Sequence, residues 1–467
     1  MHTTRDRQVS WTEKIGFASG AFGIGICTML LRIHLVFFYS DIVGLTAGLV
    51  GVAALVSNGW DAVSDPAMGV ISDRTNSRWG RRRIYLILGA VPLALFTFLI
   101  WSPPAQMSHE VLFWYTLGVL LVLFTFITVC YVPHMALGAE LSYDPHQRAQ
   151  TYGARYIAET SGSLVAATVP FMYLERVGNA REGYASIGGV TGVVIIALLL
   201  VSFFTTRERQ PHGLTPEPGS GAPRGFAAVV DYYRDLLGSL RNRPLWYLLA
   251  AAIAVEIGTG ITYTLMTFVA KYWLDMERLR APLFLVYMVA AMMSVPMWVG
   301  ISKRFGKKYV YIFSQFVITI VLFFVVFLEP GRIIRAFSLM VVAGWGIGGY
   351  SLLPALIADL ADLDEYQRGL RREGSFFGLY SLCRKGSMAL GMYIASKGLD
   401  VIGYFPDMPN PDKIVPGLRF LFGPMTAIIT LLGALIFLKF PFTKARHEEI
   451  QAALRERDRE ANGSAAN

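Results

Sequence analysis

About twelve apolar stretches, each roughly 20 residues long, are the feature that most constrains how this chain can fold. An α-helix of that length crosses the hydrocarbon core of a bilayer, which is about 30 Å thick. Segments such as 193–201 and 320–328 are apolar at every position, whereas the strands of a transmembrane barrel alternate apolar and polar residues. Charged residues make up only 16% of the chain, against about 25% in soluble proteins. The sequence therefore predicts an all-α polytopic membrane protein and excludes barrel, disordered and fibrous chains.

The predicted spans fall into two groups of six. They begin near residues 15, 45, 84, 112, 150, 187, 244, 281, 308, 333, 373 and 415. The longest polar gap lies between the sixth and seventh spans, and its proline- and glycine-rich part is typical of a flexible linker before a surface helix. We therefore expect a six-helix bundle over 1–205, a cytoplasmic linker over 206–243, a second six-helix bundle over 244–440 and a cytoplasmic tail over 441–467.

Two short motifs recur in the same order in both halves. The first is Gly69-Val-Ile-Ser-Asp-Arg74 followed by Gly80-Arg-Arg-Arg83, repeated as Gly300-Ile-Ser-Lys-Arg304 followed by Gly306-Lys-Lys308; the second is Ala136-Leu-Gly-Ala-Glu140, repeated as Ala355-Leu-Ile-Ala-Asp359. Recurrence at corresponding places indicates a duplicated, parallel repeat. The sequence thus predicts the major facilitator fold, in which 12 transmembrane helices form two six-helix halves around a central path.

The charges predict the orientation of the chain in the membrane. The net charge is +9, and most of the 42 lysines and arginines fall in loops on the side of the two termini. The positive-inside rule then places both termini and the linker in the cytoplasm, in a multi-pass protein of the cell (inner) membrane. Because the basic residues are spread over short loops, nucleic-acid binding is not expected. The segment 1–13 lacks the pattern of a cleaved signal, and the three cysteines fall within spans, where apolar packing is their default role.

The second span carries two acids one helical turn apart, Asp61 and Asp65. Residues at i and i+4 share a helix face, and two carboxylates within a span are costly unless a cation, a proton or a basic partner neutralises them. The alternative is that both acids end a helix near a loop, but about ten residues of span precede Asp61. The second half has Ser294-Val-Pro296 at the equivalent place, so a cation site is predicted in the N-terminal bundle.

Basic residues inside spans must face a cavity or a partner rather than lipid. This applies to Arg32 and Arg155, and Arg155 has Glu159 one turn later, so it forms either an internal salt bridge or a contact with substrate. Arg384 and Lys385 are neighbours on a helix and point about 100° apart, so only one of them is expected to face the central path. Lys385 is the predicted counter-charge of the acid pair.

The loop after the second span is basic and rich in glycine, but it lacks the strand–loop–helix setting of a phosphate-binding loop. We expect it to act as a conformational latch whose charged groups exchange partners as the two halves rock. The predicted latch residues are Gly69, Asp73, Arg74, Gly80 and Arg81. The sequence has no metal-ligand spacing and no nucleophile with a paired histidine, so neither an enzyme nor a cofactor is expected, apart from a coupling ion.

Several segments resemble the glycoside-pentoside-hexuronide:cation symporter family of the major facilitator superfamily, the group of the melibiose carrier. The resemblance rests on Phe38-Tyr-Ser-Asp-Ile-Val-Gly-Leu45, Trp60-Asp-Ala-Val-Ser-Asp-Pro66, Ser77-Arg-Trp-Gly80, Val132-Pro133, the helix of Arg155, the segment 358–365 and Arg384-Lys-Gly386. It implies that Asp61 and Asp65 bind the coupling cation, Na⁺ or H⁺, with Thr128 as a neutral ligand. It also implies that Arg155 and Lys385 line the path of a substrate bound at mid-membrane.

The chain departs from the melibiose carrier at the positions that hold its sugar. By the resemblance, the first-helix acid of that carrier is Gly25 here, its fourth-helix acid is Tyr131 and its fourth-helix aromatic residue is Met135, whereas Tyr350 keeps the aromatic residue of the tenth helix. A third carboxylate for sodium is therefore missing, and a galactoside substrate is not implied.

The predicted function is secondary active symport of a glycoside, pentoside or hexuronide-type sugar, driven by a cation or proton at the acid pair. Arg32, with Arg155 and Lys385, suits an anionic substrate such as a hexuronide or a lipid headgroup. Animal lysolipid transporters of the superfamily are also similar, so cation-coupled transport of a lysophospholipid or other amphiphile is one alternative. The other is a non-transporting membrane receptor or scaffold. The expected partners are a small-molecule substrate and the lipid bilayer, and the protein is expected to be monomeric.

Overall fold

The computed structural model describes residues 9–142, 144–208, 226–368, 373–406, 408, 410–441, 449–450 and 453, and this part of the chain is helical with no β-strand. The predicted flexible part of the linker and most of the predicted tail lie outside the described residues. The helices of the N-terminal half are α1 (Trp11–Phe37) with its π-helical extension η1 (Phe38–Val43), α2 (Ala47–Arg74), α3 (Ile84–Trp101), α4 (His109–Glu140), α5 (Pro145–Leu174) and α6 (Ala180–Thr205).

The C-terminal half follows a short helix, α7 (Phe226–Gly238), and a single turn, η2 (Ser239–Arg241). Its helices are α8 (Arg243–Phe268) with the π-helical extension η3 (Val269–Trp273), the turn η4 (Glu277–Leu279), α9 (Arg280–Phe305), α10 (Lys307–Val325), α11 (Ile333–Gly348) continuing through η5 (Gly349–Leu352) into α12 (Leu353–Arg368), α13 (Glu373–Val401), the turn η6 (Pro411–Lys413), and α14 (Val415–Phe420) continuing through η7 (Leu421–Met425) into α15 (Thr426–Leu438). A helix begins within two turns of each of the twelve predicted starts. The predicted all-α fold is confirmed.

Nine helices of the described chain are long and apolar enough to cross a membrane. Three further helices of similar length, α2, α5 and α13, are too polar to meet that condition. They carry all the ionisable residues that the sequence predicts along the central path except Arg32, which lies on α1. Their polarity is therefore concentrated on positions that lipid does not cover.

The two repeated motifs contact each other in the same way in both halves. In the N-terminal half, Arg81 and Arg82 of the loop after α2 pair with Glu140 at the end of α4. In the C-terminal half, the Nζ atom of Lys307 lies 2.7 Å from a carboxylate oxygen of Asp359. The glycine before each basic cluster has a positive φ, +99° at Gly80 and +85° at Gly306, a conformation that a side chain disfavours. These equivalent contacts agree with the predicted parallel repeat.

The two halves contact each other at the end of the bundle opposite to the start of α1. We call this end the distal end. The π-helical turns η1 and η3 are equivalent in the repeat, and η1 presents Asp41 to η3. The Nζ atom of Lys271 lies 2.6 Å from Asp41 Oδ2, and the hydroxyls of Tyr272 and Tyr404 also donate to this carboxylate. A buried acid from one half is thus satisfied by a base and two tyrosines from the other.

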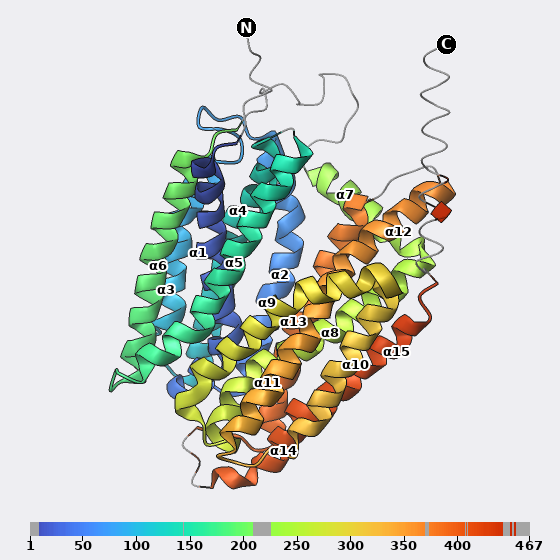
Figure 1. The fold of residues 1–467 in the computed structure, drawn as a ribbon. Helices are drawn as coiled ribbons and strands as arrows, with labels where there is room; N and C mark the ends of the chain where they lie inside the picture. The colour runs from blue at the N-terminus through green and yellow to red at the C-terminus, as the bar shows by residue number, and fades with distance from the viewer. Residues whose placement is uncertain are drawn as a thin grey trace, which may run out of the picture.

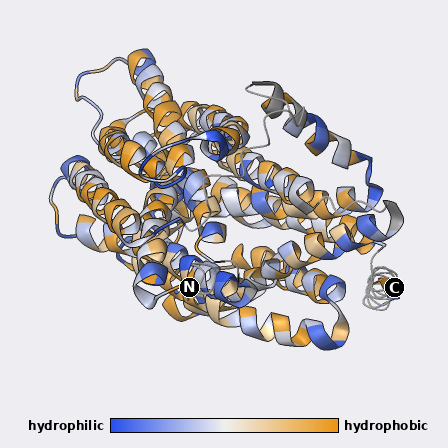
Figure 2. Ribbon diagram, turned by 90° about the horizontal axis from the view of Figure 1, so that it is seen from above, coloured by the Kyte–Doolittle hydropathy of each residue, from blue (hydrophilic) through white to orange (hydrophobic). Residues whose placement is uncertain are grey.

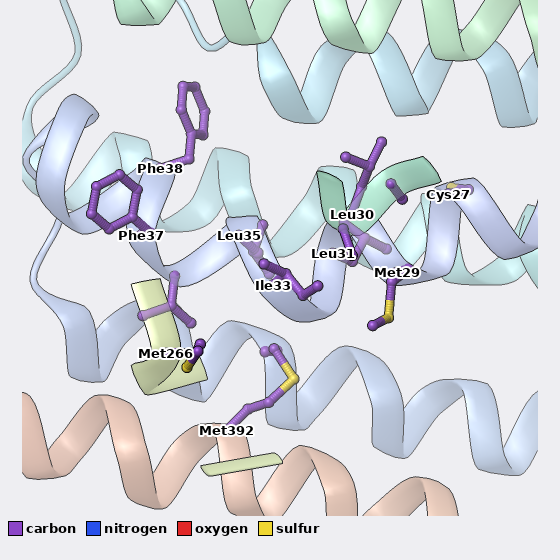
Figure 3. Packing of buried hydrophobic residues seen from close by; sticks show 14 of the residues in the cluster. Cys27, Met29, Leu30, Leu31, Ile33, Leu35, Phe37, Phe38, Met266 and Met392 are labelled. Carbon is purple, nitrogen blue, oxygen red and sulfur yellow. The ribbon is translucent and has the colours of Figure 1, made fainter. Parts of the chain in front are cut away.

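Helices α2 and α13 add a second connection at the distal end. The backbone N–H of Gly48, in the first turn of α2, donates to Asp400 Oδ1 at 3.1 Å. The N-terminal end of a helix favours such a carboxylate. Apolar packing continues the interface, since side chains of α1 lie beside Met266 of α8 and Met392 of α13 (Figure 3).

At the opposite, terminal end, the short helix α7 lies between the N-terminal half and α12 (Figure 1). Viewed onto this end, hydrophilic residues are concentrated in the loops, and hydrophobic residues cover most of the helices (Figure 2). The hydroxyl of Tyr233 in α7 lies 3.4 Å from the carbonyl oxygen of Ala62 and 3.1 Å from that of Val63. Pro66 has no N–H to offer the carbonyl of Ala62 one turn earlier, so Tyr233 supplies a donor where α2 lacks one.

Helices α1 and α5 pack so closely that glycine is required at their contact. An added Cβ atom would lie 2.5 Å from the carbonyl oxygen of Glu159 at Gly25, and 2.2 Å from that of Phe22 at Gly162. Both obstacles are backbone atoms, which cannot rotate away as a flexible side chain can. The contact therefore seals the two helices against each other.

We predict that Gly162→Val destabilises the protein, whereas Gly153→Val on the same helix does not, since a Cβ at Gly153 meets no atom within 4 Å. Overpacking of this kind costs about 1–3 kcal/mol. Thermal unfolding of the purified protein in detergent, followed by tryptophan fluorescence, measures the effect. Equal melting temperatures for the two variants would contradict the close contact of α1 with α5.

Candidate functional site

The predicted acid pair lies on the inward face of α2. Asp61 is buried, and Asp65 is partly buried one turn further along. The Thr128 hydroxyl of α4 lies 2.7 Å from Asp61 Oδ1 and 3.0 Å from Asp65 Oδ1. One hydroxyl carries one proton, so it donates to one carboxylate at a time. The structure therefore brings together the three residues predicted to bind a cation, and that role stays a prediction.

Lys385 of α13 provides the positive charge for both acids. Its Nζ atom lies 2.7 Å from Asp61 Oδ2 and also contacts Asp65 Oδ2. Its side chain is 16% exposed, so water screens these ion pairs only in part. The predicted counter-charge is thus in place, and it comes from the other half of the molecule.

Tyr131 of α4 lies between two basic side chains. Lys385 Nζ is 5.8 Å from the centroid of its ring, and the guanidinium carbon of Arg155 is 5.2 Å from it; both distances suit cation–π contact. Arg155 also forms a salt bridge of 2.9 Å with Glu159 along α5. The internal salt bridge is therefore present, and contact of Arg155 with a substrate stays a prediction. Its Nε and Nη2 atoms are buried without a hydrogen-bond partner in the described chain.

A cavity lies between the two halves beside these residues. Its ionisable lining residues are Arg32, Asp61, Asp65, Glu159, Arg384 and Lys385. The remaining lining mixes polar side chains such as Asn58 and Thr28 with apolar ones such as Phe124 and Met388. Such a surface suits a ligand with both hydroxyl groups and an apolar face.

Both members of the Arg384-Lys385 pair line this cavity. The prediction that only one would face the path is therefore wrong. The cavity reaches around α13 far enough to meet two side chains that leave the helix in different directions. Lys385 turns to the acids of α2, whereas Arg384 lies 4.0 Å from Glu256 of α8.

Tyr350, at the start of the kink between α11 and α12, lies beside the cavity rather than in its lining. Its hydroxyl donates to Glu256 Oε1 at 2.8 Å and accepts from the hydroxyl of Tyr380 at 2.9 Å. The predicted aromatic platform is thus engaged in a hydrogen-bonded chain within the C-terminal half. Its role toward a substrate stays a prediction.

A second cavity lies on the terminal side of the acid–lysine cluster and shares Asp65 and Lys385 with the first. It is also lined by Gly69 and Asp73, two of the predicted latch residues, and by Tyr232 and Tyr233 of α7. The ion pairs of Lys385 therefore separate the two cavities. Helix α7 lies over the second one.

The remaining latch residues are held within the N-terminal half. Asp73 Oδ1 lies 2.6 Å from Arg82, and Arg81 pairs with Glu140. The positive φ of Gly80 turns three successive N–H groups, those of residues 81–83, toward the carboxylate of Glu208 at 2.8–2.9 Å. Arg74 ends α2 beside this loop. The latch role stays a prediction, and Glu208 is a partner that the sequence pattern did not indicate.

Several functional candidates were missed from the sequence. Asp41 interrupts an apolar run, which is a usable signal for a buried acid, but its partners come from segments more than 200 residues away. Glu208 and Tyr233 belong to the linker region, where no periodic pattern points to a contact. In the described residues, no group of three or more His, Cys, Asp or Glu side chains is placed to hold a metal ion.

Comparison with known proteins identifies the fold and the family. The family described as MFS/sugar transport protein matches residues 16–444. A glucuronide carrier protein homolog of Escherichia coli is 25% identical over 95% of both chains, and a putative glycoside/cation symporter of the same organism is 27% identical over 96% of this chain and 95% of that one. A sodium-dependent lysophosphatidylcholine symporter of Danio rerio is 25% identical over 98% of this chain and 91% of that one.

Solved structures share the architecture at low sequence identity. A D-xylose-proton symporter superimposes with a TM-score of 0.65 at 13% identity, covering 92% of this chain and 97% of that one. The resemblance found in the sequence motifs is therefore confirmed, and the major facilitator fold is shown. The chain belongs to the MFS/sugar transport protein family and is a polytopic membrane transporter, not an enzyme.

Proposed function

We propose that the protein is a cation-coupled symporter that imports a glycoside-type sugar across the cell (inner) membrane by alternating access. The observation that carries the proposal is the contact of Lys385 with both Asp61 and Asp65 across the two halves. Two acids one turn apart require a positive charge, and in the empty carrier the ammonium group supplies it. Na⁺ or a proton replaces that charge when the carrier is loaded. Names of the relatives that contain glycoside, glucuronide and symporter support this reading.

Replacement of Lys385 by the cation gives a physical basis for coupling. The ion pairs with Lys385 connect α2 to α13 and lie between the two cavities. A cation at Asp61 and Asp65 releases the lysine and changes the contact between the halves. Coupling requires that the exchange between the two open states be favourable for the empty or the fully loaded carrier but not for the half-loaded one.

The side of the membrane follows from charge. We place the terminal end in the cytoplasm because the lysines and arginines are concentrated there. The Asp41 cluster then closes the outer side of the carrier, together with the contact of Gly48 with Asp400. In this assignment the second cavity leads from the cation site toward the cytoplasm.

Transport of a lysophospholipid is the alternative, favoured by the similarity to the lysophosphatidylcholine symporter. An apolar groove of the kind that holds an acyl chain is present between α1, α5 and α6. At Gly25 and Gly162 the backbones of α1 and α5 are in close contact. This contact lies between the apolar groove and the charged cavity, so it separates the two. We therefore rank a sugar first.

We predict that Asp61→Asn and Asp65→Asn each reduce concentrative sugar uptake at least about tenfold, because an amide cannot provide the negative charge that holds a cation in a low-dielectric site. Asp412→Asn, at an exposed position, is the matched control and should retain full uptake. The measurement is uptake into proteoliposomes with a Na⁺ or a pH gradient, after size-exclusion chromatography has shown that each variant is folded. Full accumulation by both site variants would reject the cation site.

We predict that Lys385→Gln separates exchange from net transport. Without the ammonium group, the acids bind the cation about tenfold more tightly, but the empty carrier has two uncompensated carboxylates and returns slowly. Net uptake should therefore fall, whereas exchange of external for internal labelled sugar, in which the carrier returns loaded, should persist. Lys413→Gln, at an exposed position, is the control. Loss of exchange and net uptake together, in a folded variant with unchanged cation affinity, would contradict the proposed role.

A further inference from the structure

The charges around the central cavity form a nearly complete set of pairs. Four acids lie in or beside the cavity, and each has a partner: Asp61 and Asp65 contact Lys385, Glu159 contacts Arg155, and Glu256 accepts from Tyr350 and lies 4.0 Å from Arg384. Four basic residues accompany them, namely Arg32, Arg155, Arg384 and Lys385. With all eight groups ionised, the formal charge of the empty site is zero.

Arg32 is the exception among these residues. It lines the cavity from α1, yet it has no hydrogen bond or ion pair with any residue of the described chain. Arg384 carries the same charge and lines the same cavity, so the two guanidinium groups repel each other. An arginine in the middle of a transmembrane helix is costly unless something pairs with it. Its charge is therefore available to a ligand.

Arg384 faces the same cavity from the other half with most of its donors unused. Its nearest acid, Glu256, lies 4.0 Å away, which is too long for a hydrogen bond. The Glu256 carboxylate is already occupied by the hydroxyl of Tyr350 at 2.8 Å. Two guanidinium groups from α1 and α13 thus line one cavity, and within the described residues neither donates a hydrogen bond to a carboxylate. Guanidinium groups match carboxylates through paired, charge-assisted hydrogen bonds.

We infer that Arg32 and Arg384 together bind the carboxylate of an acidic glycoside, so that the substrate carries one negative charge. This inference rests on the proposed function of the same cavity. The arginines come from opposite halves, α1 and α13. A carboxylate held between them therefore relieves their mutual repulsion and links the two halves. The hydroxyl groups of the sugar then face the polar lining around Asn58 and Thr28.

The same arrangement explains why cation and substrate must move together. The empty site is neutral, a bound cation makes it positive by one charge, and a bound monoanion returns it to zero. A net charge inside a low-dielectric cavity is far more costly than a neutral set of pairs. The carrier with only one ligand bound therefore exchanges slowly between its two open states. The empty carrier and the carrier with both ligands bound exchange readily. One cation with one acidic sugar crosses without net charge.

An anionic lipid headgroup presents the same chemistry as a sugar acid. The contact of α1 with α5 separates the charged cavity from the apolar groove around Leu30 and Val169, because Gly25 and Gly162 bring the two backbones together. A soluble substrate enters without parting these helices. We therefore assign the anion to a glycoside, and we include a lysolipid as an arm of the experiment.

The test compares matched sugars on matched variants. Thermal stabilisation of the purified protein by methyl β-D-glucuronide and by methyl β-D-glucoside is measured with and without Na⁺ at two pH values, since a ligand stabilises by RT ln(1 + [L]/Kd). The wild type should bind the glucuronide at least about tenfold more tightly than the glucoside, and Arg32→Gln and Arg384→Gln should each remove that preference. Arg32→Lys should retain part of it, and Arg278→Gln, at an exposed position, should be unchanged.

Several results would overturn the inference. Equal binding of the two sugars, or an unchanged glucuronide preference in folded Arg32→Gln and Arg384→Gln, rejects the carboxylate site. Tighter binding of lysophosphatidylglycerol than of the glucuronide, lost in Arg32→Gln, assigns the arginines to a lipid instead. Cation-dependent binding of the glucoside alone leaves the proposed symport standing and rejects the acidic substrate. Absence of any cation dependence with either sugar contradicts the proposed symport itself.

Electrical recording gives a second readout that does not depend on affinity. Proteoliposomes that take up the glucuronide with one cation should show no net current, and an imposed membrane potential should leave the initial uptake rate unchanged. A neutral sugar with one cation would instead move one charge per sugar. A current proportional to glucuronide uptake therefore rejects the proposed neutrality of the loaded carrier.

Discussion

The contact of one lysine with two aspartates is the interaction on which the rest of the arrangement depends. Asp61 and Asp65 require a positive charge because they lie in a span, and Lys385 brings that charge from the other half at 2.7 Å from Asp61. The ion pairs neutralise the acids, join α2 to α13 and separate two cavities. Any cation that takes the place of the ammonium group therefore alters charge, interface and access together.

The distribution of polarity among the helices has the same origin. Helices α2, α5 and α13 are the long helices that fall short of a transmembrane hydropathy, and they provide five of the six ionisable residues that line the central cavity. The sixth, Arg32, lies on α1. The other residues of α1 are so apolar that the helix still has the mean hydropathy of a membrane span. A charge inside a span is tolerated where a partner of opposite charge or a ligand faces it.

Much of this organisation was predictable because membranes restrict the choices of a chain. Length and apolarity predicted the helix starts, and recurrence of the Gly-Arg and Ala-Glu motifs predicted the repeat; their mutual contact, Arg81 with Glu140 and Lys307 with Asp359, required the structure. The one-turn spacing of Asp61 and Asp65 predicted a shared face. Periodicity does not show which distant segments are in contact. The partners of Asp41, and the fact that Arg384 and Lys385 line the same cavity, could therefore not be predicted from the sequence.

Helix α7, between the two halves in the chain, contacts the segment of α2 that carries Asp61 and Asp65. Pro66 follows Asp65 directly and leaves the carbonyl of Ala62 without its helical donor, and Tyr233 of α7 approaches that carbonyl. Tyr232 lies against Gly378 of α13, where an added Cβ would be 2.4 Å from its hydroxyl. Helix α7 therefore contacts α2 and α13 on the terminal side of the ion pairs that join them. A movement that separates Lys385 from the acids must also change the contacts of α7, so this helix is coupled to the ion pairs that lie between the two cavities.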